Sequence, residues 1–383
     1  MRVVLLGSGS LDSSLSARLV NLGRELVQRG WDVTIMVPAG DKYNGNSRTT
    51  VARAFGMTVI HPRQFRTRFA SVNFLPYLPS AVFALLRLEA DIVHIYKPTP
   101  LTIVGLIKAV RGRTKIVLDM DDLGAVVMAR EGNPRWKTEL VKLSESLAAR
   151  LANGIVTASS YLESRYRQQF PKKPIVWVPN GVRGITRSQS KPPTQARIVY
   201  IGSLNNRVSV MPLLESLPAV IRALAPRRVS VQVIGSGTEL EALTRHITTV
   251  GLSDVVSFLG WIDRTDIGKF ASSGSVGYCC VPDTQAFRAA SNQKVFDYLS
   301  LGIAPLVSAV GDLPFYVDHG RAGYIVDGDL ATAVAAALAD TATLTAKIDA
   351  GRRYLESHFL WPILAGQIED LYSSLLTPTV TYT

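Results

Sequence analysis

Cysteine is almost absent from this chain of 383 residues, and long apolar runs are missing altogether. Its two cysteines, Cys279 and Cys280, are adjacent, so they cannot form a disulfide framework, and a reducing, cytoplasmic setting is expected. No apolar run approaches the length of about 18 residues that a membrane span requires. The short apolar run at residues 3–6 is stopped by Gly7, which favours a buried first strand over a signal peptide.

Acidic residues are missing from one long stretch. The chain has a net charge of +12 at pH 7, yet between residues 42 and 87 it has no acid. The basic residues there are Lys42, Arg48, Arg53, Arg63, Arg66, Arg68 and Arg87, and the aromatic ones are Phe65, Phe69, Phe74, Tyr77 and Phe83. This mixture favours contact with an anionic membrane surface, as a peripheral protein on the inner face of the membrane. A solvated basic face over ordinary core aromatics remains open. Nucleic acid is not expected, because no module that binds it is visible.

Short apolar segments alternate with amphipathic ones through the first half of the chain. Strands are expected at residues 2–6, 32–37, 58–60, 92–95, 115–118, 154–158 and 175–178. Between the first two, Leu19, Leu22 and Leu26 recur at helical spacing, and Gly30 is a typical stop for that helix. The alternation predicts an α/β, doubly wound domain with a parallel sheet over residues 1–182.

Residues 183–197 are polar and basic, contain proline and have no periodicity, which is typical of a linker between domains. The alternation then resumes, with strands expected at residues 198–201, 229–234, 255–258, 276–280 and 323–326. A second α/β domain over residues 198–356 follows, and a helical stretch is expected over 344–376. Two such domains joined by one linker are expected to bind a ligand in the cleft between them.

The segment from Ser291 to Gly302 carries the clearest functional signal. A polar turn with Asn292 and Gln293 precedes a helix on which Lys294 and Asp297 lie within about one turn of each other. Free amides at a helix start can hold a phosphate, and a carboxylate can accept hydrogen bonds from sugar hydroxyls. The pattern suits an enzyme that handles a nucleotide sugar.

Several motifs together resemble the family 4 glycosyltransferases, which have the GT-B fold. They are VPNGV at 178–182, YIGS at 200–203, VIGSG at 233–237, VSFLGW at 256–261, KVFDYLSLG at 294–302, HFLW at 358–361 and QIEDLY at 367–372. The resemblance implies two facing Rossmann-like domains, with a final helix at 357–376 that crosses back onto the N-terminal domain. It also implies transfer of a sugar from a UDP-, GDP- or similar nucleotide sugar with retained anomeric configuration, and no cofactor or essential metal.

The resemblance also assigns donor residues, with some departures. The family often has two glutamates eight positions apart, of which the second falls on Asp297 and the first on Ala289, which cannot bind a hydroxyl. An arginine that holds the diphosphate falls on Ser203. Arg207 lies beside the position of the family's lysine and is the substitute, with Lys294 as a further candidate for phosphate or sugar.

Glycine loops that follow expected strands complete the donor candidates. Gly7, Gly9 and Ser10 form a fragment of a dinucleotide-type loop that would let backbone amides approach the donor phosphates, although a plain tight turn explains it equally well. In the second domain Gly202 and Gly235 lie at corresponding strand ends.

Carboxylates end a buried strand of the first domain. Asp119, Asp121 and Asp122 follow residues 116–118, and the carboxyl end of such a strand borders the ligand cleft. Asp121 and Asp122 are therefore candidates to orient or deprotonate an acceptor hydroxyl, with a helix N-cap as the simpler role for one of the three. The Asp-x-Asp pattern belongs to another glycosyltransferase fold, so no metal is expected. His94 lies at a neighbouring strand end, where catalytic and structural roles are both open.

The sequence thus predicts a retaining glycosyltransferase of the hexosyltransferase type, acting in cell-envelope polysaccharide or glycolipid synthesis. Its acceptor would be a glycan or a lipid-linked sugar. A nucleotide-sugar epimerase of the same fold remains an alternative, but it would need extra catalytic carboxylates and a histidine near the donor, and the five histidines do not cluster in the second half. A non-catalytic carbohydrate-binding relative is the other alternative, suggested by Ala289 and Ser203.

Overall fold

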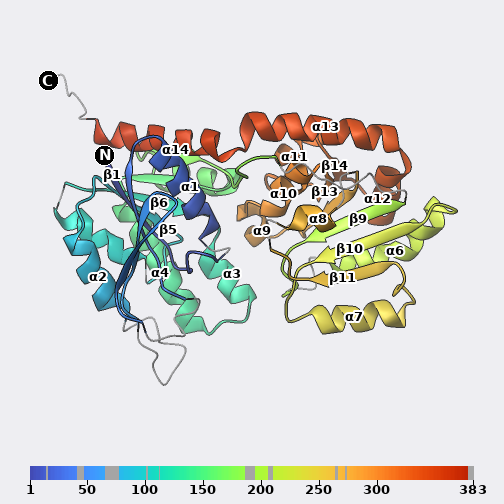
Figure 1. Cartoon of the computed structure of the whole chain (residues 1–383), viewed down its shortest axis with the longest axis horizontal. Helices are drawn as coiled ribbons and strands as arrows, with labels where there is room; N and C mark the ends of the chain where they lie inside the picture. The colour runs from blue at the N-terminus through green and yellow to red at the C-terminus, as the bar shows by residue number, and fades with distance from the viewer. Residues whose placement is uncertain are drawn as a thin grey trace. The chain divides into compact units, whose positions relative to one another are not determined.

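The chain forms two compact units in a computed structural model, which describes residues 1–13, 16–40, 47–64, 77–100, 102–111, 113–185, 195–205, 210–263, 266–271 and 274–377 (Figure 1). Unit 1 contains Met1–Pro179, Ala289–Ser291 and Trp361–Thr383. Unit 2 contains Asn180–Arg288 and Asn292–Leu360. Each unit has its own sheet and its own core.

The sheet of unit 1 has eight strands in the order β3-β4-β2-β1-β5-β6-β7-β8. The strands are β1 (Arg2–Leu6), β2 (Asp32–Met36), β3 (Thr50–Ala54), β4 (Met57–His61), β5 (Ile92–Tyr96), β6 (Lys115–Met120), β7 (Gly154–Thr157) and β8 (Ile175–Trp177). All neighbours are parallel except β3 and β4, which form an antiparallel pair at one edge. The direction of the connections reverses at β1 and β5, where open α/β sheets bind their ligands.

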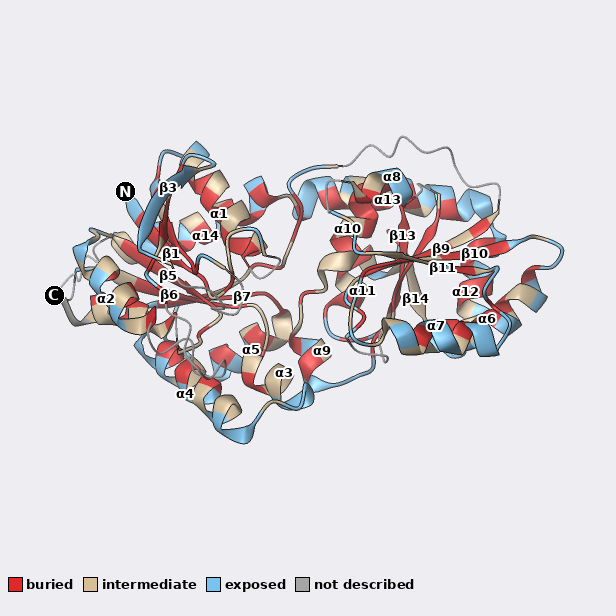
Figure 2. Ribbon diagram, turned by 60° about the horizontal axis from the view of Figure 1, so that its bottom comes forward, coloured by how far each residue is buried: buried red, intermediate tan, exposed pale blue. Residues whose placement is uncertain are grey.

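Helices cover both faces of this sheet. They are α1 (Ala17–Gln28), α2 (Tyr77–Arg87), the 3₁₀ helix η3 (Ile103–Arg111), α3 (Gly124–Arg130), α4 (Arg135–Leu151), α5 (Ser160–Gln169) and α14 (Trp361–Leu376). Successive strand residues point to opposite faces. Val3 and Leu5 therefore pack with α1 and α14, and Val4 and Leu6 pack in the core beneath α2 and α4. The inner strands are buried along most of their length (Figure 2).

The sheet of unit 2 has six parallel strands in the order β11-β10-β9-β12-β13-β14. They are β9 (Ala196–Ile201), β10 (Val229–Ile234), β11 (Val256–Gly260), β12 (Val276–Cys279), β13 (Ala304–Ser308) and β14 (Tyr324–Val326). The helices are α6 (Met211–Leu224), α7 (Leu240–Thr249), α8 (Ile267–Phe270), α9 (Gln285–Ala289), α10 (Gln293–Leu301), α11 (Leu313–Tyr316), the 3₁₀ turn η5 (Asp318–Gly320), α12 (Leu330–Ala339) and α13 (Thr341–His358).

The doubly wound α/β prediction is confirmed for both units, and three details differ. β3 was not expected, because its residues are exposed and lack an apolar pattern. The expected terminal helix is two helices: α13 belongs to unit 2 and α14 to unit 1. Pro362 lies in the first turn of α14, where a proline fits because its missing N–H would have no helical partner. A new helix therefore begins there, after a short break that follows α13. The leucine spacing predicts a helix from residue 15 after the first strand, and the helix begins at Ala17.

The return of the last helix to unit 1 is confirmed. Trp361, Leu364, Ile368 and Tyr372 of α14 are buried in the same core as the leucines of α1. The expected linker at residues 183–197 overlaps the start of β9, and residues 186–194 lie outside the described part of the chain. Within the described residues, no helix combines the length and the apolar character needed to cross a bilayer.

Candidate functional site

Two glycine loops of unit 2 lie against each other at the carboxyl ends of β9 and β10. Gly202 N donates to Ile234 O at 3.0 Å, and Leu204 N donates to Ser236 O at 3.0 Å. Gly235 has φ of 149°, and a Cβ atom on it would lie only 1.9 Å from the carbonyl oxygen of Gly202. The close contact between the two loops therefore requires glycine at position 235.

Lys294 of α10 lies over these loops. Its Nζ is 3.4 Å from the Tyr200 hydroxyl and 4.4 Å from the centre of that ring, which is a cation–π contact. A Cβ atom on Gly202 would lie 3.2 Å from the same Nζ. Among the described residues no carboxylate forms an ion pair with Lys294. A partly buried ammonium without a carboxylate at a glycine loop is an arrangement that suits an anionic ligand.

The next turn of α10 holds a carboxylate and a structural tyrosine. Gln293 Nε2 donates to Asp297 Oδ1 at 3.2 Å and to Gly181 O at 3.1 Å, which orients the carboxylate. The Tyr298 hydroxyl accepts from Ile201 N and donates to Tyr278 O, both at 3.0 Å. This fully buried tyrosine fixes α10 against β9 and β12, and thereby fixes the height of Lys294 and Asp297 above the sheet.

The other residues of the second half that were predicted to bind the donor do not all lie beside Lys294. Asn292 is the N-cap residue of α10. Ser203 O accepts from the Tyr200 hydroxyl at 3.2 Å, so Ser203 lies beside Lys294. Ser291 is buried and falls in the short segment that is grouped with unit 1. Arg207 lies outside the described residues.

In unit 1 the predicted residues gather at the carboxyl ends of β1, β5 and β6. Gly7 N donates to Met36 O at 3.1 Å, and Gly9 O accepts from the Ser16 hydroxyl at 2.9 Å. A Cβ atom on Gly7 would lie 2.8 Å from Leu19 Cδ1, so the loop packs closely against α1 at this glycine. Ser10 O accepts from Ser13, which closes a tight turn before α1.

Asp121 and Asp122 share one lysine that sequence reasoning had not selected. Lys97 Nζ lies 3.0 Å from Asp121 Oδ2 and 2.7 Å from Asp122 Oδ2. The Tyr96 hydroxyl also donates to Asp121 Oδ2, at 2.9 Å. Lys97 has φ of 49°, an uncommon left-handed conformation that bends the chain sharply at the end of β5. Burial alone would lower the pKa of Lys97, but Asp122 and Asp121 outweigh it and raise the pKa.

Asp119 and His94 belong to a deeper network. Asp119 Oδ2 accepts from Arg18 Nε at 2.8 Å and lies 3.2 Å from His94 Nε2, while His94 Nδ1 lies 2.7 Å from the Tyr372 hydroxyl. Burial would raise the pKa of Asp119, but the Arg18 charge and the His94 contact lower it. Because His94 is completely buried with both ring nitrogens engaged, its position suits a positioning role better than contact with a substrate.

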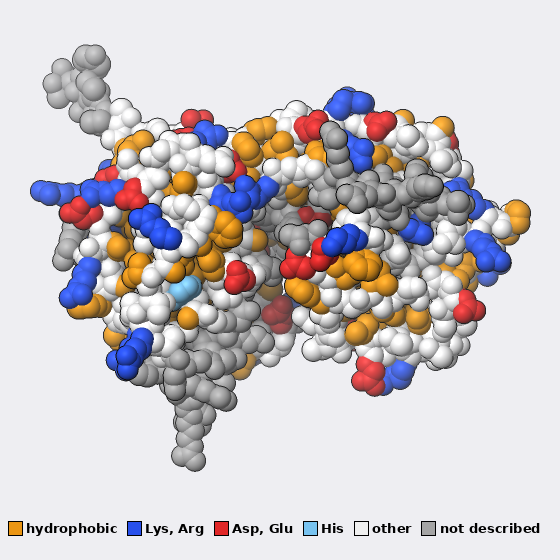
Figure 3. Space-filling model, in the orientation of Figure 1, with side chains coloured by type: hydrophobic (Ala, Val, Ile, Leu, Met, Phe, Trp, Pro, Cys, Tyr) orange, Lys and Arg blue, Asp and Glu red, His pale blue; other side chains and the backbone are white. Residues whose placement is uncertain are grey.

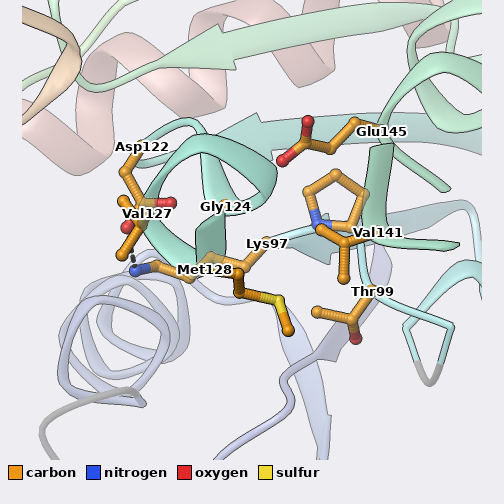
Figure 4. A pocket seen from close by; sticks show the side chains of 9 residues that line it. Lys97, Thr99, Asp122, Gly124, Val127, Met128, Val141 and Glu145 are labelled. Atoms are coloured by element: carbon orange, nitrogen blue, oxygen red, sulfur yellow. Dashed lines mark hydrogen bonds and ion pairs between the residues drawn. The ribbon is translucent and has the colours of Figure 1, made fainter. Parts of the chain in front are cut away.

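A cavity of about 160 Å³ opens beside Asp122 and Lys97 (Figure 4). Its lining residues are Lys97, Pro98, Thr99, Asp122, Gly124, Val127, Met128, Val141 and Glu145. Burial raises the pKa of Glu145 to about 7, although its carboxylate accepts from Ala125 N at 3.2 Å. Sequence reasoning missed Glu145, because a glutamate within an amphipathic helix gives no sign that it faces a cavity. The cavity offers carboxylates beside an apolar wall, a combination that fits a sugar ring.

Two family models match most of the chain. The "Glycosyl transferase 4-like domain" matches residues 15–181, and the "Glycosyl transferases group 1" domain matches residues 195–343. The chain belongs to the family 4-like glycosyltransferases. In sequence the chain is similar to the GDP-mannose-dependent alpha-(1-6)-phosphatidylinositol monomannoside mannosyltransferase of Mycobacterium tuberculosis, with 26% identity over 259 residues. That match covers 60% of the chain and 65% of the relative.

Solved structures show the same GT-B fold. A sucrose-phosphate synthase from Thermosynechococcus elongatus has a TM-score of 0.75 at 17% identity, covering 98% of this chain and 99% of that one. HepE from Anabaena, in complex with UDP and glucose, has a TM-score of 0.72 at 16% identity, covering 98% and 100%. The prediction that the chain has the GT-B fold is therefore confirmed.

The basic stretch at residues 42–87 is only partly described. Lys42, Arg66 and Arg68, with Phe65, Phe69 and Phe74, lie outside the described residues. Arg48, Arg53, Arg63 and Arg87 are exposed, and the Arg87 guanidinium stacks 3.9 Å from the ring centre of the exposed Phe83. Tyr77 is a core residue. Lysine and arginine side chains are dispersed over the visible face of the molecule (Figure 3).

Within the described residues, no group of three or more histidine, cysteine, aspartate or glutamate side chains is arranged to hold a metal ion. Asp119 in β6 pairs with Arg18, and Asp121 and Asp122 after this strand pair with Lys97. Burial raises the pKa of both thiols, that of Cys279 to about 11.

Proposed function

We propose that this chain is a retaining glycosyltransferase that moves a sugar from a nucleotide diphosphate sugar to an acceptor hydroxyl. The observation that carries the proposal is Lys294, which lies over the Gly202 and Gly235 loops with no carboxylate paired to it among the described residues. Family membership supports the reaction class. No cofactor is needed for it.

In this proposal unit 2 holds the donor. Lys294 and the amides at the start of α10 stabilise the leaving diphosphate, and Asp297 accepts hydrogen bonds from the ribose hydroxyls. The bond between the anomeric carbon and the β-phosphate oxygen breaks, and its electron pair stays on the nucleoside diphosphate. The acceptor oxygen bonds to the anomeric carbon on the same face and gives its proton to the leaving diphosphate, so the configuration is retained. The predicted role of Arg207 on the diphosphate remains a prediction.

The acceptor belongs to unit 1. The carboxylates of Asp122 and Glu145 accept hydrogen bonds from its hydroxyls, and Val127, Met128 and Val141 pack against its ring. Asp121, held by Tyr96 and Lys97, orients Lys97 beside the cavity. The acceptor is a glycan or lipid-linked sugar of the cell envelope. The name of the mycobacterial relative, which acts on a phosphatidylinositol monomannoside, supports a lipid-linked one.

The test is release of nucleoside diphosphate from a panel that includes GDP-mannose and UDP-glucose, with and without lipid-linked acceptors. One donor should be consumed, faster with acceptor, and NMR of the product should show the donor's anomeric configuration. Release from no donor, together with no binding of any, would refute the proposal. An inverted product would refute the retaining mechanism alone.

Variants locate the donor site. Asp297→Ala and Lys294→Met should each weaken donor binding about tenfold or more, because each removes a hydrogen bond to a charged group. Asp254→Ala and Lys269→Met change exposed residues of the same unit and serve as matched controls. Unchanged donor affinity in both site variants would place the donor elsewhere.

A further inference from the structure

Helix α4 of unit 1 presents large apolar side chains to solvent. Trp136 is 49% exposed, Leu143 64%, Leu147 41% and Leu151 50%, and we call these four residues the α4 stripe. They follow one another at separations of seven, four and four residues, which places them on one side of a helix. The opposite side, with Val141, Ser144 and Ala148, is buried in the unit. Figure 2 shows α4 on the outside of its unit.

The helix is held firmly in place. Its inner side packs in the core, and the Lys173 ammonium donates to Ala149 O at 2.5 Å and to Arg150 O at 3.1 Å, which satisfies its last carbonyls. The α4 stripe is therefore exposed on a rigid element. Single apolar residues are common on protein surfaces, but four on one side of a helix form a patch of the kind that marks an interaction site.

The charges around the stripe are mainly positive. Arg135, Lys137, Lys142 and Arg150 lie on the same helix, whose acids are Glu139 on the outside and Glu145 at the cavity. The Lys137 ammonium lies 5.5 Å from the centre of the Trp136 ring, so one cation and the aromatic ring are presented together. An outward helix face with tryptophan and leucine at its centre and cations at its margin matches the boundary between lipid headgroups and acyl chains.

We propose that the α4 stripe docks unit 1 onto an anionic lipid bilayer, with the apolar side chains at the acyl boundary and the arginines and lysines among the phosphates. A second copy of this chain fits less well, because it would bring the same cations together. A lipid surface provides apolar contact and negative charge at once. Docking requires no sugar transfer, and it uses a different surface from the predicted one at residues 42–87.

The test is sedimentation of the full chain with phosphatidylcholine vesicles, with and without phosphatidylglycerol, in the absence of nucleotide sugar. The protein should bind the anionic vesicles, less well as salt rises, and bind neutral ones weakly. Trp136→Ser combined with Leu143→Ser should lower binding at least tenfold, with thermal unfolding near that of the wild type because both side chains point outward. Phe270→Ser is the matched control, an exposed apolar residue of unit 2.

A second readout reports on the contact itself. Tryptophan emission should shift to the blue on binding, and Trp136→Phe should lose that shift while it keeps the binding. The proposal is overturned by equal binding to neutral and anionic vesicles, or by full binding of the double variant. Loss of binding in Arg53→Glu with Arg87→Glu, but not in the double variant, would assign docking to residues 42–87 instead. Self-association that the double variant abolishes, without vesicle binding, would make a second copy the occupant.

Discussion

Arg18 Nε lies 2.8 Å from Asp119 Oδ2, and both side chains are almost completely buried. The same guanidinium donates to Val178 O at 2.9 Å and to Pro179 O at 3.1 Å, where unit 1 first ends in the chain. Its charge also lies 5.7 Å from the centre of the Trp361 ring, where the chain returns to that unit. One arginine of α1 therefore contacts β6, the residues where the chain leaves unit 1, and the residue where it returns to that unit.

Replacing Arg18 by methionine should destabilise unit 1 strongly. The change leaves the Asp119 carboxylate buried without its charge partner, which costs about 3–5 kcal/mol. Urea denaturation followed by tryptophan fluorescence measures the loss. Arg245→Met, which breaks an exposed ion pair with Glu241, is the control and should cost less than about 1 kcal/mol. Equal losses in the two variants would contradict the importance of the buried pair.

Glu145 should make stability depend on pH. Its pKa rises from the ordinary 4.5 to about 7 in the fold, so between these values the unfolded chain has lost a proton that the folded chain keeps. Stability contributed by the protonated form is therefore lost as pH rises from about 4.5 to about 7, by roughly 3 kcal/mol at about 1.4 kcal/mol per pKa unit.

Glu145→Gln removes this titration and keeps an oxygen that can accept from Ala125 N. The variant should therefore gain stability over the wild type at pH 8, and the gain should shrink toward pH 5. Denaturant midpoints at several pH values measure the difference. Glu139→Gln, on the exposed side of the same helix, should follow the wild-type profile. A pH-independent gap for Glu145→Gln would show that this carboxyl titrates normally.

Gly235→Ala should disrupt the donor side of unit 2. The added methyl would collide with the Gly202 carbonyl, so the two loops must move apart, at a cost of about 1–3 kcal/mol. Thermal unfolding and nucleoside diphosphate binding should both deteriorate. Gly184→Ala meets no atom within 4 Å and is the matched control. Wild-type behaviour of Gly235→Ala would mean that the loops are looser than the structure shows.

Neither cysteine should react readily in the folded protein. Burial raises the pKa of Cys279 to about 11 and also raises that of Cys280, so little thiolate exists at neutral pH. Iodoacetamide labelling read by mass spectrometry should be slow in the native state and should reach both thiols in urea. Rapid native labelling at pH 7 would contradict the raised pKa values of the two thiols.

The sequence predicted the elements whose signal is local. Buried parallel strands such as β5 and β6 are short apolar runs, so their existence and order could be inferred. The edge strand β3 could not, because an exposed strand such as TVARA lacks that signal. The polar ends of strands also identified Asp121, Asp122, Gly202 and Gly235 as residues that lie at the carboxyl edges of the sheets.

Contacts between residues that are far apart in the sequence could not be predicted. Arg18 and Asp119 are 101 residues apart, and Tyr372 meets His94 across 278 residues, so nothing in either local pattern links them. Lys97 was not selected as a site residue, because a lysine that precedes a proline is common in ordinary turns. Glu145 was missed because helical periodicity gives the side of the helix but not the cavity that lies beneath it.

The crossing of α14 constrains the order in which the chain can fold during synthesis. Residues 361–376 complete the core that begins at Val3, and all of unit 2 lies between them in the sequence. During synthesis, unit 2 therefore leaves the ribosome before unit 1 has its last helix. Until α14 is made, one face of the sheet of unit 1 stays partly uncovered. A nascent chain stopped before Trp361 should bind chaperones through that face.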